Sequence, residues 1–210
     1  MAEEPKVQSK VNLLGDARAE FDHSMLDLAF HEWQDYKSLL DANDRFIVVG
    51  RRGTGKSALT YKLQQEWQLK KHIVIVVAPN EEDLTGLRGA VHKYGDKLNR
   101  IRSAVKIGWR YALIMEILSA LSAHYKTQQL VTGSSIYSKH VVPWEKSGTS
   151  PLIRLKKILI AKYNNSESQE ENVSELASRL ELTALNNQMR DILAKAGRGV
   201  VVLIDRLDEG

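Results

Sequence analysis

The chain has 210 residues, of which 43% are hydrophobic and 27% are charged, and these values are typical of a globular protein with one sizeable core. Its 30 basic and 26 acidic residues leave a formal net charge of +4, which permits a nucleic-acid partner without requiring one. The absence of cysteine excludes disulfides, thiolate metal sites and cysteine nucleophiles. The opening MAEEPKVQSK lacks the basic and apolar regions of a signal peptide, and no stretch reaches the roughly 18 apolar residues of a membrane-spanning helix. We therefore expect a cytoplasmic protein.

The N-terminal part of the chain predicts a flexible start followed by a helix. Residues 1–12 are polar and are expected to be flexible, so that residues 13–210 form the folded domain. Beyond them, apolar residues recur at steps of three and four, which places one apolar stripe along a helix: Phe21, Met25, Leu26, Leu28, Ala29 and Trp33. This helix precedes the first cluster of glycines.

A strand, a helix and a second strand are predicted next. The unbroken β-prone run RFIVVG indicates a buried strand near residues 45–50. Apolar residues from Ala58 to Trp67 indicate a helix that ends at about Leu69, and HIVIVVAP indicates a second buried strand closed by Pro79. This order is typical of a βαβ unit with parallel strands.

The middle of the chain, at about residues 80–195, is predicted to be a mainly helical insertion. IGWRYALIMEILSALSAHY is apolar on most sides and indicates a buried helix, whereas NNSESQEENVSE is polar and acidic and is the best candidate for a mobile loop. The last amphipathic helix ends at Gly197, which is placed as a C-cap. GVVVLIDRLDEG then predicts a third buried strand near residues 199–205.

The glycines after the first predicted strand carry the clearest functional motif. Gly50, Gly55, Lys56 and Ser57 match G-x-x-x-x-G-K-[ST], the phosphate-binding loop called Walker A, and Gly53, Thr54 and Ala58 complete the candidate site. Bare backbone lets successive N–H groups surround a β-phosphate at a helix N-terminus, while the lysine reaches the β- and γ-phosphates and the serine hydroxyl binds Mg²⁺. The alternative is a chance match in a strand-to-helix turn, but the flanking strand and helix favour the phosphate loop.

The last predicted strand carries a second acidic motif. Asp205 follows the apolar run VVVLI, where a Walker B aspartate would hold Mg²⁺ through water. Asp208 or Glu209 would orient or deprotonate the attacking water, and the sequence does not decide between these two. The alternative reading is a strand that ends in a solvated acidic turn. With a phosphate loop upstream we expect the catalytic set Lys56, Asp208 and Glu209, with Ser57 and Asp205 as metal ligands.

The two motifs together predict a fold and a cofactor. We expect an α/β domain of the P-loop NTPase type, with three α/β/α layers, a parallel central sheet and the helical insertion. The expected cofactor is Mg²⁺-ATP, with ATP favoured over GTP because no N/T-K-x-D guanine motif is present.

The motifs also resemble a known class. D-x-x-D-E in DRLDEG resembles the Walker B of STAND P-loop ATPases, including their NACHT branch, and LLGDARAEFDHSMLDLAF is similar to the segment that AAA+ and STAND proteins place before the phosphate loop. The resemblance implies an ATP-hydrolysing regulatory switch domain in bacterial defence or signalling, which forms a homo-oligomer and continues beyond Gly210. The alternatives are an AAA+-like DNA-handling ATPase and a nucleotide-gated scaffold without turnover. Residues 80–195 match no motif of the class.

Weaker signals receive structural interpretations. Arg51 and Arg52 are expected to face solvent, as variable loop residues usually do. The basic stretches KLNRIRSAVKIGWR and RLKKILIAKY lack the interleaved aromatics of a base-stacking surface, so nucleic acid is possible but not indicated. The six histidines have no metal-ligand spacing and are expected to be structural.

Overall fold

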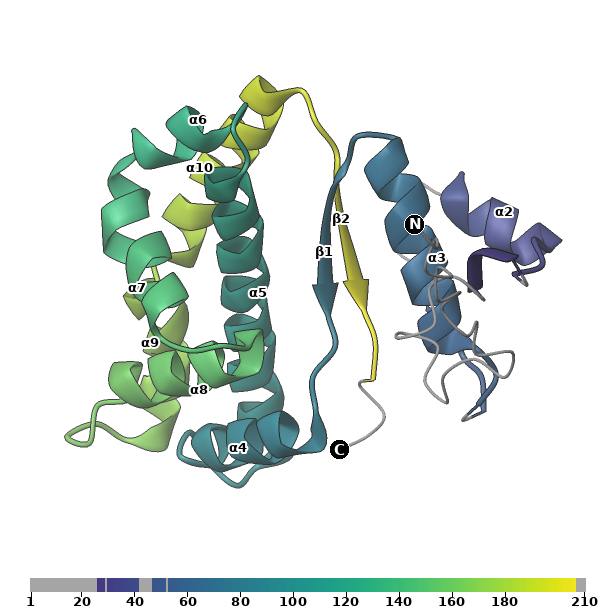
Figure 1. Cartoon of the computed structure of the whole chain (residues 1–210). Coiled ribbons are helices and arrows are strands. Elements are labelled where there is room, and N and C mark those ends of the chain that lie inside the picture. Colours follow the sequence, from purple (N-terminus) through teal and green to yellow (C-terminus); the bar gives the residue numbers. More distant parts are fainter. Residues whose placement is uncertain (1–25, 29, 42–46, 52, 207–210) are drawn as a thin grey trace, which may run out of the picture. The chain divides into compact units, whose positions relative to one another are not determined.

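The computed structural model describes residues 26–28, 30–41, 47–51 and 53–206 (Figure 1). It divides into two compact units, unit 1 (Met1–Gln65) and unit 2 (Glu66–Gly210). The boundary between them falls inside helix α3 (Lys56–Leu69). Each unit has its own set of internal contacts.

Unit 1 contains helix α2 (Gln34–Leu40), the glycine loop and the first turns of α3. The Tyr36 side chain is buried and its ring lies 5.1 Å from that of Phe30, which in turn lies 5.4 Å from Trp33. An ion pair between Lys62 and Asp27 joins α3 to the segment before α2. Of the helix predicted from Phe21 to Trp33, residues 21–25 and 29 lie outside the described residues, residues 26–28 are helical and residues 30–33 are not, and α2 begins just after them.

The sheet of unit 2 consists of strands β1 (Ile73–Val77) and β2 (Val200–Ile204). The strands are parallel and in register from Ile73 opposite Val200 to Val77 opposite Ile204. Alternate residues of β1 are buried, and Val200 and Val202 of β2 pack against the same core. The strands predicted around residues 73–79 and 199–205 are confirmed, but β2 is half-buried and ends in the exposed Ile204, so the burial predicted for it is wrong.

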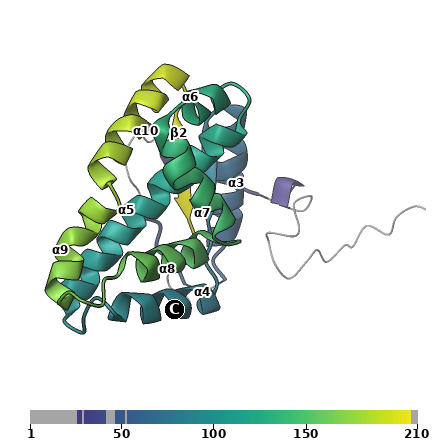
Figure 2. The same ribbon diagram turned by 90° about the vertical axis from the view of Figure 1, so that its left-hand side faces the viewer.

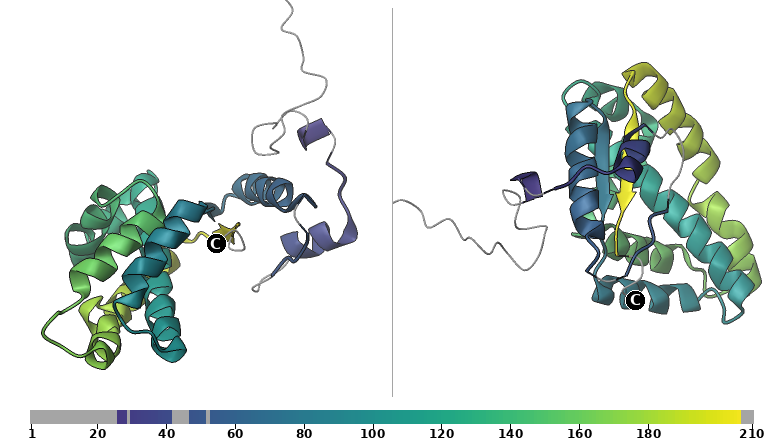
Figure 3. Two further views of the ribbon diagram at one scale, coloured as in Figure 1. Left: turned by 90° about the horizontal axis from the view of Figure 1, so that it is seen from below. Right: turned by 90° about the vertical axis from the view of Figure 1, so that its right-hand side faces the viewer.

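Helices fill the chain between the two strands, the range for which the sequence predicts a helical insertion (Figures 1 and 2). They are α4 (Glu81–His92), α5 (Leu98–Ala123), α6 (Gln128–Thr132), the π-helix η2 (Tyr137–Val141), α7 (Val142–Lys146), α8 (Pro151–Lys162), α9 (Gln169–Arg179) and α10 (Leu182–Ala196). These helices are gathered beside the two strands (Figure 3), and α5 runs between the sheet and most of the other helices (Figure 1).

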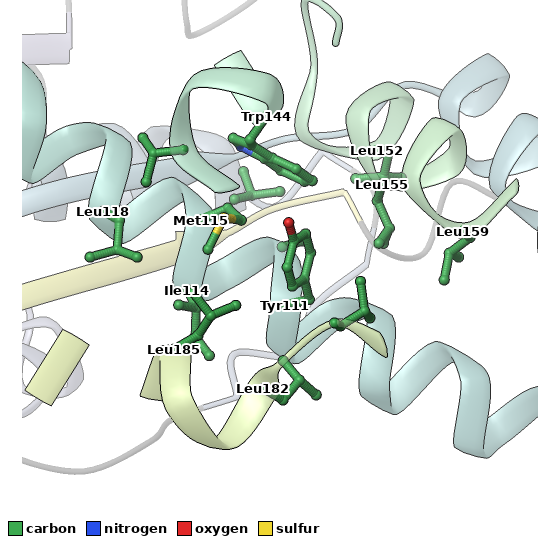
Figure 4. Packing of buried hydrophobic residues seen from close by; sticks show 14 of the residues in the cluster. Tyr111, Ile114, Met115, Leu118, Trp144, Leu152, Leu155, Leu159, Leu182 and Leu185 are labelled. Atoms are coloured by element: carbon green, nitrogen blue, oxygen red, sulfur yellow. The ribbon is translucent and has the colours of Figure 1, made fainter. Parts of the chain in front are cut away.

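The core of unit 2 is built around α5, because this long helix is apolar on most of its circumference. Met115 and Leu118 are fully buried and contact side chains from several helices (Figure 4). The Trp144 indole donates to Glu116 Oε1 over 2.8 Å, and Arg154 binds the same oxygen over 2.9 Å. These bonds satisfy the half-buried carboxylate, which would otherwise lose free energy when it leaves water.

The segment expected to be a mobile loop is ordered, so that prediction is wrong. Asn172 is fully buried and its amide donates to the carbonyls of Asn164, Glu167 and Ser168 over 2.9, 3.3 and 3.1 Å. Ser168 and Glu171 form a reciprocal capping box that starts α9. A polar composition therefore reflects local capping here, because the side chains of Asn164, Ser168, Glu171 and Asn172 bind backbone groups.

The predicted three-layer α/β/α sheet is also wrong, because β1 and β2 are the only strands among the described residues. Residues 47–50, the described part of the strand expected near 45–50, have no strand conformation. Ile47 and Val49 are 90% and 89% exposed. A β-prone run becomes a strand only when its backbone groups find partners in a ladder, and the described part of the chain supplies none to this run.

Candidate nucleotide-binding site

The glycine loop adopts a conformation that most residues avoid. Gly53 and Gly55 have φ angles of +82° and +85°, and Thr54 lies between them. A side chain at either glycine would be strained at this φ, although no other heavy atom lies within 4 Å of the position a Cβ would take. In an anion-binding nest, left-handed residues alternate with right-handed ones and turn neighbouring N–H groups toward one side, and the left-handed Gly53 and Gly55 on either side of Thr54 fit that pattern.

The start of the loop is closed by a tight turn. Thr54 donates to the Arg51 carbonyl through both its hydroxyl, over 2.8 Å, and its backbone N–H, over 3.3 Å. A Cβ at Gly50 would lie 2.6 Å from the Thr54 hydroxyl oxygen, so a larger residue would open this turn. Arg51 is exposed, as expected, and Arg52 lies outside the described residues.

Lys56 is the first residue of α3 and folds back over the loop. Its ammonium donates to the Gly50 carbonyl over 2.8 Å and to the Arg51 carbonyl over 3.4 Å. Ser57 follows in the first turn of the helix, and Ala58 is buried. The loop therefore combines a nest of N–H groups, a helix N-terminus and a cation, the three features that bind phosphate.

Asp205 lies at the carboxyl end of β2, where the sequence predicts it. Its backbone N–H donates to the Val77 carbonyl over 2.9 Å and extends the parallel ladder by one bond. Its carboxylate accepts from the Arg206 N–H over 3.0 Å, and Arg206 has a φ of +61°. Asp208 and Glu209 lie outside the described residues, so their roles stay predictions.

The predicted site residues belong to both units. Gly50, Gly53, Thr54, Gly55, Lys56, Ser57 and Ala58 lie in unit 1, and Asp205 lies in unit 2. Within the described ranges, no three His, Asp or Glu side chains are grouped as metal ligands. The pairing of Ser57 with Asp205 around Mg²⁺ thus stays a prediction.

A buried polar cluster that the sequence analysis missed lies in unit 2. His140 Nδ1 lies 3.4 Å from the Tyr111 hydroxyl, and His140 Nε2 lies 3.3 Å from Glu181. Lys139 also pairs with Glu181, whose φ of +52° is unusual for a side chain of this size. Only the helical fold brings these residues together, because they are up to 70 positions apart in the sequence.

Burial controls the ionisation of this cluster. Burial lowers the pKa of His140, and the hydrogen bond that the imidazole donates to the Glu181 carboxylate opposes that effect. Burial also raises the pKa of Tyr111 to about 12, and the charge of Glu181 adds to this rise. Hydrogen bonds from Lys139 and His140 lower the pKa of Glu181. The His140 side chain is only 7% exposed, whereas Lys139 and Glu181 are 62% and 40% exposed, so the imidazole itself is enclosed by the helices that it joins.

Comparison with known proteins gives one informative similarity. The chain is 35% identical over 207 residues to the "Putative transposon gamma-delta 80.3 kDa protein" of Escherichia coli. The aligned region covers 98% of this chain but 30% of that protein, so the chain spans less than a third of the relative's length. No family model and no solved structure matches the chain.

A separate finding concerns membranes. None of the helices in the described part of the chain is both long and apolar enough to span a bilayer.

Proposed function

We propose that this chain binds Mg²⁺-ATP through the loop at Gly50–Ala58 and serves as an ATP-hydrolysing regulatory switch. The observation that carries the proposal is the pair of left-handed glycines, Gly53 and Gly55, directly before a helix that begins at Lys56. The open space beside both glycines leaves room for a phosphate against the backbone. The cytoplasm supplies both ATP and Mg²⁺, and a chain without cysteine suits that compartment.

Each predicted site residue has a role in binding or hydrolysing the nucleotide. The loop N–H groups bind the β-phosphate, and Lys56 leaves the carbonyls of Gly50 and Arg51 for the β- and γ-phosphates. Ser57 and Asp205 supply hard oxygen ligands of the kind that Mg²⁺ prefers. Asp208 or Glu209 positions the water that attacks the γ-phosphate.

Two other functions remain as rivals. A DNA-handling ATPase is favoured by one observation, the similarity to a protein whose name connects it with a transposon. A nucleotide-gated scaffold would bind ATP without turnover. The resemblance to STAND ATPases supports the switch, in which ATP drives the assembly of a homo-oligomer.

Equilibrium binding of a fluorescent ATP analogue tests the proposal. Lys56→Ala should abolish binding, because it removes the charge that reaches the phosphates. Lys157→Ala, which changes an exposed lysine of α8, is the matched control and should leave affinity unchanged. Equal affinity of the wild type and Lys56→Ala would refute nucleotide binding at this loop.

Particle size and ATPase activity separate the three functions. The switch predicts larger particles with ATP and activity independent of DNA. Activity that DNA stimulates at low salt, but not at high salt, would favour the DNA-handling ATPase. ATP binding without measurable hydrolysis under both conditions would favour the scaffold.

Turnover gives the test of the acidic residues. Neutralising Asp208 and Glu209 together should leave ATP bound but unhydrolysed, because positioning of the water supplies most of the rate. Hydrolysis at the wild-type rate by this double variant would show that another residue is the base.

A further inference from the structure

Three turns from distant parts of the sequence meet where β1 and β2 begin. The Ile73 N–H donates to the Gly199 carbonyl over 2.9 Å, and the Arg198 guanidinium lies 3.0 Å from His124 Nε2. These contacts join the turn before β1, the connection from α10 to β2 and the turn after α5, all at the upper end of unit 2 in Figure 1. Lys71, His124, Tyr125, Lys126 and Arg198 form what we call the strand-start surface.

An exposed aromatic ring lies at the centre of the strand-start surface. Tyr125 is 76% exposed, although its ring is the size of a typical core side chain. It stacks on His124 with 5.0 Å between ring centroids and an interplanar angle of 23°. Arg198 lies 3.0 Å from His124 Nε2 and the Lys126 N–H lies 3.2 Å from His124 Nδ1, and the neutral imidazole accepts one of these two bonds, which helps to hold the ring in place. Tyr125 therefore has an ordered ring behind it.

The strand-start surface also carries positive charge. The Lys126 ammonium lies 5.6 Å from the Tyr125 centroid, and Lys71 is exposed on the neighbouring turn. Among the described residues, no ion pair includes Lys71, Lys126 or Arg198. Their charge is thus available to an anionic partner.

Close packing fixes the backbone that carries these charges. A Cβ at Gly199 would lie 2.1 Å from His72 Nδ1, so the imidazole packs directly on the glycine. Lys71 and Arg198 immediately precede these two residues and are therefore held near each other. Lys71 has a φ of +64°, which marks a tight turn before β1.

We propose that the strand-start surface binds single-stranded nucleic acid. An unpaired base stacks on Tyr125, while Lys71, Lys126 and Arg198 contact the phosphates on either side. An aromatic ring among cations is the combination that proteins use for single strands, because every base has a flat face and every linkage carries a charge.

Two other anionic partners fit the surface less well. In a duplex the base faces are covered by their neighbours, so Tyr125 would have nothing to stack on. A membrane would attract the cations, but at this end Leu69 and Tyr125 are the large apolar side chains exposed among the described residues, which gives little area for insertion.

This inference does not depend on the proposed ATP site. Asp205 follows the opposite end of β2 from the strand-start surface. The five residues of β2 separate the two ends by about 16 Å, because an extended chain rises about 3.3 Å per residue. Nucleic-acid binding is therefore expected without nucleotide and in the Lys56→Ala variant, so the two proposals can fail separately.

Fluorescence anisotropy with labelled oligothymidylate of about 16 nucleotides tests the proposal. Tyr125→Ala should weaken binding about tenfold or more, whereas Tyr125→Phe keeps the ring and should bind like the wild type. Lys126→Gln should weaken binding and reduce its dependence on salt. Lys157→Gln on α8, at the lower end of unit 2 in Figure 1, is the matched control.

Several outcomes would overturn the inference. Unchanged affinity in Tyr125→Ala, with Lys126→Gln equal to Lys157→Gln, would exclude this surface. Equal affinity for a duplex of the same sequence would exclude base stacking, and preference for anionic lipid vesicles would assign the surface to a membrane. Thermal melting of each variant shows whether a loss of binding comes from unfolding. Tyr125→Phe retains the ring, so a loss of binding in that variant would also contradict base stacking on Tyr125.

Discussion

At the scale of single residues, the same residue type serves opposite purposes in two places. At positions 53 and 55 glycine is required because the backbone has a positive φ, and there is open space beside both residues. At position 199 glycine is required because the ring of His72 packs where a side chain would lie. The sequence motif identifies the first pair, but no pattern in the sequence reveals the contact between Gly199 and His72.

Gly199→Ala should therefore destabilise unit 2. The new methyl group would overlap the His72 ring, and such overpacking costs about 1–3 kcal/mol. Gly89→Ala is the matched control in α4, where a Cβ meets nothing within 4 Å, and it should raise stability by about 0.5–1 kcal/mol. Urea unfolding measures both effects. If His72→Ala did not recover part of the loss in the Gly199→Ala background, the overlap would not be its cause.

His140 predicts how stability depends on pH. Its pKa in the folded protein lies below the ordinary 6.5 because burial disfavours the charged form, so the unfolded chain binds more protons just below pH 6.5. Stability should consequently be greatest above pH 6.5 and decrease as the pH falls toward the folded pKa.

Thermal melts between about pH 7.5 and pH 5, on either side of the ordinary histidine pKa of 6.5, test this prediction. His140→Gln can still hydrogen-bond Glu181 but does not titrate, so its melting temperature should vary less across this range. The groups around His140, namely Tyr111, Lys139, Lys162 and Glu181, remain in both proteins. An identical pH profile for the two proteins would contradict the assignment.

At the scale of elements, the sequence predicted most of what is locally determined. Two apolar runs form β1 and β2, and the amphipathic periodicity marks the last helix, whose Gly197 caps it in the left-handed region. Errors occurred where a local pattern depends on partners elsewhere. Ile47–Val49 resembles a strand but lacks a ladder, and the acidic segment before α9 resembles a loop but is tied down by Asn172.

Substitution of Asn172 tests whether its side chain holds the turn before α9. Asn172→Ala would remove one donor from each of three carbonyls, of which those of Asn164 and Ser168 keep a backbone donor, and would remove the acceptor of the Asn164 N–H and of Arg179, so unfolding should become easier by about 2–3 kcal/mol. The exposed neighbour Asn165 is the control, and Asn165→Ala should change stability by less than about 0.5 kcal/mol. A change of the same small size in Asn172→Ala would mean that the turn is not held by this side chain.

At the scale of the whole molecule, the candidate site was more predictable than the fold. Phosphate loops are set by backbone chemistry over eight residues, so Gly50, Gly55, Lys56 and Ser57 could be identified from spacing alone. The layers of a sheet depend on which distant segments pair, and one sequence carries little information about that. The strand-start surface was missed for the same reason, because its residues come from three separate turns.

Amide hydrogen exchange with and without Mg²⁺-ATP tests the central claim most directly. If the loop binds phosphate, the backbone N–H groups from Gly53 to Ser57 become hydrogen-bonded to it and should exchange more slowly with ATP. Lys56→Ala should show no such protection at the same ATP concentration. Unchanged exchange across the loop at saturating ATP, or protection confined to another part of the chain, would contradict the account.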